Sequence, residues 1–305
     1  MKTKFWGCIF GAVMLASSLQ SCQTRVEIPD GAIYPILFGS TESRAVAGLD
    51  QIKSGGFKVY AYFEGNKGNS TFEKNVRFED PYWKYDNIEY WIPNTTYNFK
   101  AFYPRPDKMT ACTFVFSNTA DQSYLVSQFD ITKQEDFMVA TDSRRVNENS
   151  VPEGGSTVTL NFNHQLACVE FKIKSAINVT IETITLNNIA NLYKCDNGEW
   201  SRGDAGNMTD LVLTSNRELT PGADYADVIE GGILVIPAMT GSESFTIKLS
   251  NNKTYSNIPL PSGANWEKGN KYTYTAEIKQ NDIIFNEPKV EIWDSESATG
   301  SVIIK

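Results

Sequence analysis

Apolar and polar residues alternate along most of this chain, and strict alternation predicts β-strands that bury one face. The clearest alternating stretches span residues 57–64, 97–103, 245–249 and 272–278. Turn-forming pairs such as Gly154-Gly155 and Gly231-Gly232 separate such stretches. Only residues 120–136 favour a short helix. Many short strands in a chain of 305 residues predict an all-β fold of two consecutive β-sandwich domains.

The alternation changes phase near Gln165. Apolar residues take the even positions from Val158 to Phe162 and the odd positions from Ala167 to Ile173. Because side chains along a strand alternate strictly between two faces, this slip predicts a bulge, a bend or a change of sheet. We place the junction of the domains within residues 156–166, with one sandwich over 45–160 and the other over 161–305. A simple bulge inside one domain is the alternative.

Residues 1–21 have the pattern of a secretory signal peptide. Two lysines precede a run of apolar or small residues from Phe5 to Leu19, which is shorter than the about 20 apolar residues of a membrane-spanning helix. The run ends in Leu19-Gln20-Ser21-Cys22, which resembles a bacterial lipobox. That resemblance implies cleavage before Cys22, acylation of its thiol and anchoring in the cell outer membrane. An ordinary signal peptide with a chance cysteine is the alternative.

Composition argues against several classes of function. The net charge is −8 and no basic block occurs, which speaks against nucleic-acid binding. Cys8 leaves with the predicted signal peptide and Cys22 is the predicted lipid site, so Cys112, Cys168 and Cys195 remain. Three cysteines cannot all pair, and we therefore expect no disulfide-stapled scaffold. With His164 as its one histidine and no C-x-x-C motif, the chain predicts no metal site and no cofactor. His164 follows an apolar stripe, which favours a structural histidine over a catalytic one and a protein that is not an enzyme.

Aromatic residues cluster after Pro81. Trp83 and Tyr85 fall in a predicted hairpin, and aromatic rings on a surface can stack on sugars. These two residues are therefore candidate glycan contacts, and a glycan-binding surface lipoprotein is the alternative function. In the opposing interpretation, Trp91 and alternate tyrosines pack the core.

Short motifs of strand and turn residues occur in one order over nearly the whole chain. They span residues 90–93, 97–104, 136–140, 160–167, 234–237, 266–274, 292–294 and 300–304. Their order and spacing together resemble the fimbrillins, the subunits of the type V pilus of anaerobic Gram-negative bacteria. The resemblance implies transthyretin-like, Greek-key sandwiches and a structural subunit of a cell-surface fimbrium, with adhesion as a supporting role.

The resemblance also implies how such a subunit matures. The precursor is exported as a lipoprotein, and an arginine-specific protease cuts its N-terminal region. In this sequence the matching bond joins Arg44 and Ala45, so residues 22–44 form a lipidated propeptide. Loss of the propeptide strand opens a groove, which a strand of another pilus subunit fills, and the subunits join head to tail. A tip or anchor subunit of the same family is a further alternative.

The propeptide contains a stretch that is apolar on both faces, namely Tyr34, Ile36, Leu37 and Phe38. Such a strand is expected to be buried or covered, and its loss should leave an edge that another strand can join. The predicted donor is the C-terminal strand with Val302, Ile303 and Ile304, moving together with residues 283–293. The alternative is that both segments simply complete the second sandwich.

Overall fold

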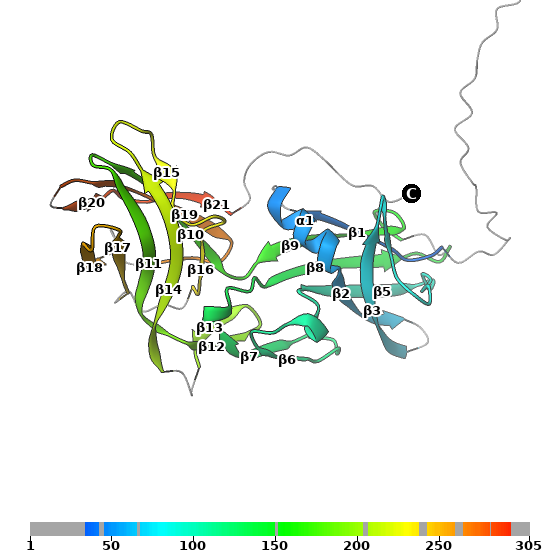
Figure 1. Ribbon diagram of the computed structural model, residues 1–305. Helices are drawn as coiled ribbons and strands as arrows, with labels where there is room; N and C mark the ends of the chain where they lie inside the picture. The colour runs from blue at the N-terminus through cyan, green and yellow to red at the C-terminus, as the bar shows by residue number, and fades with distance from the viewer. Residues whose placement is uncertain are drawn as a thin grey trace, which may run out of the picture. The chain divides into compact units, whose positions relative to one another are not determined.

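The structure is a computed structural model that describes residues 34–42, 46–65, 68–149, 152–203, 207–237, 243–259, 265–280 and 282–293 (Figure 1). Within these residues, strands dominate, and the helices are α1 (Val46–Gly55) and two short 3-10 helices. The predicted all-β fold is confirmed. No helix in the described ranges is both long and apolar enough to cross a bilayer.

A seven-stranded sheet forms from the N-terminal half of the chain. Its strands, in spatial order, are β1 (Leu37–Glu42), β9 (Thr157–His164), β8 (Met138–Val146), β5 (Thr95–Tyr103), β2 (Phe57–Gly65), β3 (Gly68–Glu79) and β4 (Tyr82–Lys84). β1 runs parallel to β9, and the other neighbours pair antiparallel. Alternate residues such as Phe57, Val59 and Phe99 are buried in one core, as the alternation predicts.

Two further sheets form a sandwich from the C-terminal half. One contains β10 (Ala167–Ser175), β15 (Ala226–Asp227), β16 (Ile233–Val235), β19 (Asn270–Ile278), β20 (Ile283–Phe285) and β21 (Lys289–Ile292). The other contains β11 (Val179–Ala190), β14 (Met208–Leu219), β17 (Ser244–Leu249) and β18 (Thr254–Pro259), which form the second layer in Figure 1. The rings of Phe171 and Phe245 meet between the layers, with centroids 4.5 Å apart.

A fourth sheet joins strands from both halves of the chain. Its order is β13 (Glu199–Arg202), β12 (Leu192–Asp196), β7 (Tyr124–Asp130) and β6 (Thr113–Phe116). The antiparallel pair of β12 and β7 crosses the domain boundary proposed at residues 160/161, and that boundary stays a prediction. The helix predicted for residues 120–136 is wrong, because this segment forms β7 and only a 3-10 turn at Ile131–Lys133.

The phase slip near Gln165 coincides with a change of sheet. β9 ends at His164 in the seven-stranded sheet, and β10 begins at Ala167 in the sandwich. Between them, the Gln165 amide donates a hydrogen bond to the Phe137 carbonyl at 2.8 Å. The change of phase therefore turns the apolar residues of each strand toward a different core.

Cys112, Cys168 and Cys195 are the cysteines among the residues that the structure describes. Cys112 is half-buried, Cys168 and Cys195 are buried, and no disulfide joins these described cysteines. Burial raises the pKa of Cys112 to about 12 and that of Cys195 to about 11. Both thiols therefore stay protonated at neutral pH. Because the thiolate is the reactive form, these cysteines are poor nucleophiles.

Candidate functional site: the slot around residues 34–42

The predicted site residues divide into those that the structure describes and those that it does not. Tyr34, Ile36, Leu37 and Phe38 are described, and they form the start of one strand segment. Cys22, Arg44, Ala45, Val302, Ile303 and Ile304 lie outside the described residues, and their roles stay predictions. We refer to residues 34–42 as the slot strand.

The slot strand lies between two backbone walls. At its start, the Ile36 amide donates to the Glu89 carbonyl at 2.8 Å, and the Trp91 amide donates to the Tyr34 carbonyl at 2.9 Å. On the other side, the Leu37 amide donates to the Ser156 carbonyl at 3.2 Å, and residues 37–42 then pair with β9 up to Phe162. Residues 89–91 therefore form one wall of the slot beside residues 34–36, and residues 156–162 form the other wall along residues 37–42.

Two side chains of the slot strand enter the core. Ile36 is 0% exposed and Phe38 is 1% exposed, because alternate residues of a strand point to the same face. The Phe38 ring meets Tyr85 and Phe99 edge-on, at centroid distances of 5.3 and 5.8 Å. Burial of each side chain contributes about 1.5–3 kcal/mol. Tyr34 packs half-buried against the same core. Pro35 and Leu37 on the opposite face are also only half-buried, so the outward face of the strand is partly open to solvent.

Two polar side-chain groups under the slot strand, which we call the floor of the slot, donate hydrogen bonds to backbone carbonyls. The Tyr85 hydroxyl donates to the Ile36 carbonyl at 2.6 Å and accepts from the Glu89 amide at 3.2 Å. Burial raises the pKa of Tyr85 to about 12, so the hydroxyl remains a donor at neutral pH. The Trp91 indole nitrogen donates to the Ser156 carbonyl at 3.3 Å and links the two walls. A hydroxyl that binds a carbonyl accepts any extended strand, whatever its sequence.

The structure corrects the expectation that Trp83 and Tyr85 present an aromatic surface. Trp83 is only 5% exposed and packs against Phe57 and Phe78, each at a centroid distance of 5.1 Å. Tyr85 is half-buried and faces Phe38. Neither residue offers a free ring face for a sugar, and Trp91 is fully buried as well. Trp83, Tyr85 and Trp91 pack on the core, whereas Tyr82 and Tyr90 are exposed, in line with the opposing interpretation.

His164 joins the end of β9 to the C-terminal part of the chain. Its Nδ1 lies 2.8 Å from Asp136 Oδ2, and its ring stacks on Trp293 with the centroids 3.6 Å apart. Only 8% of its surface is exposed. These contacts describe a structural histidine. No group of three or more metal-ligating side chains occurs in the part of the chain that the structure describes.

The C-terminal strands β20 and β21 lie on one edge of β19. Their pairs include Ala276 with Phe285 and Tyr272 with Val290. Three side chains pack half-buried against the sandwich core, namely Ile283, Phe285 and Trp293. Ile284, Val290 and Ile292 are exposed, at 48%, 52% and 65%, and the pairing with β19 places Ile284 on the opposite face of the sheet from the other two. This C-terminal strand pair is thus an edge element with apolar residues on both faces.

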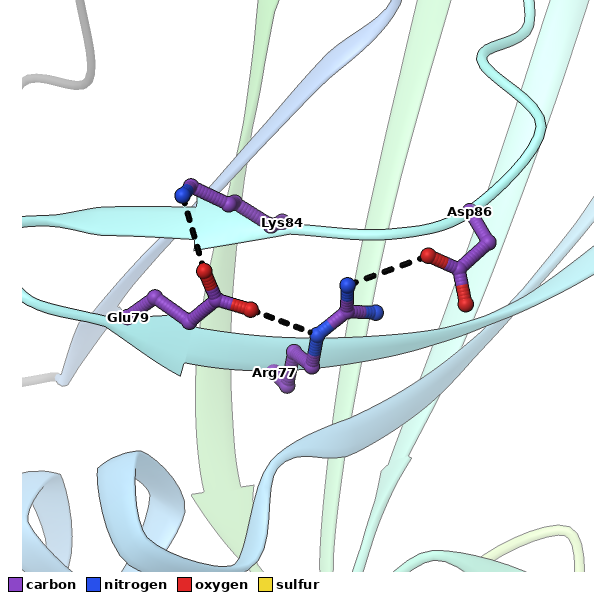
Figure 2. Close-up of polar contacts among 4 residues, drawn as sticks. All are labelled: Arg77, Glu79, Lys84 and Asp86. Atoms are coloured by element: carbon purple, nitrogen blue, oxygen red, sulfur yellow. Dashed lines mark hydrogen bonds and ion pairs between the residues drawn. The ribbon is translucent and has the colours of Figure 1, made fainter.

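The other edge of the seven-stranded sheet carries charges. Figure 2 shows Glu79 between Arg77 and Lys84, at distances of 2.8 Å from Arg77 Nε and from Lys84 Nζ. Arg77 Nη2 also lies 3.0 Å from Asp86 Oδ1. We call these four residues the charged cluster. Exposed ion pairs add little stability, but charges on an edge strand discourage the addition of another strand.

Comparison with known proteins gives a consistent result. A family model described as fimbrillin-like matches residues 43–293. The structure resembles that of a fimbrial protein from Bacteroides vulgatus ATCC 8482, with a TM-score of 0.64 and 16% identity over 85% of this chain and 99% of the other. It also resembles a candidate cell adhesion protein from Bacteroides ovatus ATCC 8483, with a TM-score of 0.55 and 15% identity over 86% and 98% of the two chains. A search of curated proteins finds no significant match.

Proposed function

Because this chain belongs to the fimbrillin-like family, we propose that it is a structural subunit of a cell-surface pilus that assembles by strand exchange. The observation that supports this most directly is the slot strand. It occupies the edge of a sheet, it fills the core with Ile36 and Phe38, and it precedes Arg44 in the sequence. A core element in that position suits a removable plug.

The predicted cut falls between two elements. β1 ends at Glu42 and α1 begins at Val46, so a cut after Arg44 separates the slot strand from the rest of the domain. The emptied slot then presents unpaired backbone on both walls together with the Tyr85 hydroxyl. Exposed edges of this kind bind an added strand through backbone hydrogen bonds.

The proposed donor is the C-terminal strand pair of another subunit, with Val302, Ile303 and Ile304 following it in the sequence. As an edge element, the pair can leave β19 without breaking the remaining order of the sheet. Donor and slot lie on different parts of the chain, so the contact is heterologous and gives an open filament. Other subunits and an arginine-specific protease are the partners in this proposal.

The proposed location changes during assembly. Acylation of Cys22 holds the precursor in the outer membrane, and cleavage at Arg44 releases the subunit into the fimbrium at the cell surface. N-terminal sequencing of surface fibres separates the roles within the family. A start at Ala45 indicates a stalk or tip subunit, and a start at acylated Cys22 indicates an anchor.

Limited digestion with an arginine-specific protease tests the proposal. The wild-type chain should lose its N-terminus up to Arg44 and form a ladder of polymers. Arg44→Ala should remain monomeric. Arg25→Ala is the matched control and should polymerise like the wild type, because cleavage at Arg25 leaves the slot strand attached. Equal behaviour of all three proteins would contradict the role of Arg44.

A further inference from the structure

The C-terminal strand pair is held on its own subunit by short ladders. β20 pairs with β19 over three residues, and β21 pairs with it over four. The side chains of Ile284, Val290 and Ile292 stay exposed and gain little burial there. Elements with few buried apolar contacts open at a low cost in free energy. Contacts beyond these ladders therefore decide how firmly the pair is held.

Trp293, directly after β21, makes such a contact with the seven-stranded sheet. Its amide donates to the Gly269 carbonyl at 2.7 Å, and its ring lies over that of His164, the last residue of β9. The two rings are nearly parallel, with an interplanar angle of 15° and centroids 3.6 Å apart. Trp293 also packs half-buried against the sandwich core. We call His164 and Trp293 the latch pair.

His164 is itself held in place. It is buried, and its Nδ1 lies 2.8 Å from Asp136 Oδ2, a contact that fixes the orientation of the imidazole. The Phe137 amide donates to Asp136 Oδ1 at 2.8 Å and fixes the carboxylate in turn. Stacked aromatic rings contribute free energy beyond the area that they bury. The stack thus ties the proposed donor to β9, the strand that also forms one wall of the slot.

We infer that the latch pair is an autoinhibitory contact that keeps the C-terminal strand pair on its own sandwich before assembly. Donation requires Trp293 to leave His164 and the strands to leave β19. A subunit without the stack should therefore release its donor more readily. Such a restraint protects the free subunit, because released apolar strands pair with other chains. The inference rests on the proposed strand exchange and adds two residues that control its rate.

Amide hydrogen exchange of the uncut chain measures release of the strand pair directly. Protection of the hydrogen-bonded amides of β21 should fall roughly fivefold in His164→Leu and in Trp293→Leu, whereas protection in β11 should not change. The double variant should lose no more protection than Trp293→Leu alone, because both substitutions remove the same contact. Asn163→Leu and Ile292→Leu are the matched controls. Each replaces the exposed neighbour of a latch residue and should keep the protection of the wild type.

Incorporation into polymers measures the effect of the latch pair on donation. A labelled chain with Arg44→Ala keeps its slot strand, so in this proposal it can donate to the cut wild-type chain but cannot accept a strand. Adding His164→Leu to the labelled chain should speed its incorporation roughly fivefold, and adding Asn163→Leu should not. His164 lies outside the donated strands, so this variant changes the latch pair and leaves the donor sequence intact.

The two measurements separate failure of the latch from failure of the exchange. Unchanged protection of β21 in both latch variants would overturn the inference, and so would losses that multiply in the double variant. Lower protection without faster incorporation would also overturn it. If His164→Leu does not fold, Trp293→Leu compared with Ile292→Leu decides the exchange measurement. If the labelled chain never enters polymers, the strand exchange itself fails, whereas protection of β21 still decides whether the latch pair holds the strands.

Discussion

The two outer edges of the seven-stranded sheet are built in opposite ways. At one edge, the slot strand lies between two walls and buries Ile36 and Phe38 in the core. At the other edge, β4 is only three residues long, and ion pairs of the charged cluster connect it to β3. Both edges bury one aromatic side chain, Phe38 or Trp83, so the contrast does not come from the core alone.

The difference shows how one sheet can direct where a strand is added. Unpaired edges invite pairing with other chains, and proteins protect them with short strands and charges or by covering them. The β4 edge has the permanent protection of charge and short length. The β1 edge is covered by a segment that the proposed cut at Arg44 removes. A subunit with this arrangement is protected until it is processed and then has one edge for assembly.

The largest effect should follow from truncating a buried side chain of the slot strand. Phe38→Ala in the uncut chain should lower the free energy of unfolding by about 3–5 kcal/mol, because a fully buried ring leaves a cavity. Tyr82→Ala on β4 removes a ring that is 41% exposed and should change it by less than about 0.5 kcal/mol. Chemical denaturation of both variants measures the difference. Equal small losses would mean that the slot strand adds nothing to the core.

Local periodicity predicted the individual strands, because successive side chains of a strand alternate between its two faces. The alternation from Phe57 and from Tyr97 gave strands, and the slip at Gln165 marked the passage from β9 to β10. The apolar stretch at residues 34–38 pointed to a core role, and Ile36 and Phe38 are buried.

Long-range pairing could not be predicted in this way. The walls of the slot lie near residues 90 and 160, and no local pattern brings them to Tyr34. For the same reason, the pairing of β7 with β12 was not foreseen. Trp83 and Tyr85 had the composition of a surface platform, but the neighbouring β2 and β1 bury them through Phe57 and Phe38. The helix α1 was not predicted because it is only ten residues long and includes Gly48 and Gly55, and glycine disfavours helix.

A second effect should follow when charged side chains at the β4 edge are replaced. Glu79→Val combined with Lys84→Val replaces the ion pair between β3 and β4 with apolar side chains and leaves only the Arg77–Asp86 pair of the charged cluster. The uncut variant should then associate into dimers and larger species, which the wild type avoids. Size-exclusion chromatography measures this association. Arg105→Val with Asp107→Val, an ion pair outside the strands, is the control and should stay monomeric. A monomeric β4 variant would mean that short length alone protects this edge.

A smaller effect should come from the floor of the slot. Tyr85→Phe removes the hydrogen bond to the Ile36 carbonyl and should reduce stability by about 1 kcal/mol. The change should appear as faster amide hydrogen exchange at Ile36 and Leu37. Tyr82→Phe loses only an exposed hydroxyl and serves as the control. Unchanged exchange in Tyr85→Phe would show that the walls hold the strand without help from the floor.

The smallest effect concerns the protonation of the charged cluster. Hydrogen bonds from Lys84 and then from Arg77 lower the pKa of Glu79. These partners stabilise the ionised carboxylate of Glu79, so their contribution is fully present above the pKa of a free glutamate. It is lost as the pH falls through the lower pKa of Glu79 in the folded state. The β1 edge, held by backbone bonds and apolar burial, should not respond over that range.

Carboxyl-detected NMR titration of Glu79 checks this prediction. Its midpoint should lie below that of an unpaired glutamate and should rise in Lys84→Ala, with a smaller rise in Arg77→Ala, following the order of the two contributions. Added salt should shrink all of these shifts, since the groups are exposed. If the midpoint is the same in both variants and in the wild type, the cluster does not hold its pairs in solution, and the short length of β4 becomes the remaining protection of that edge.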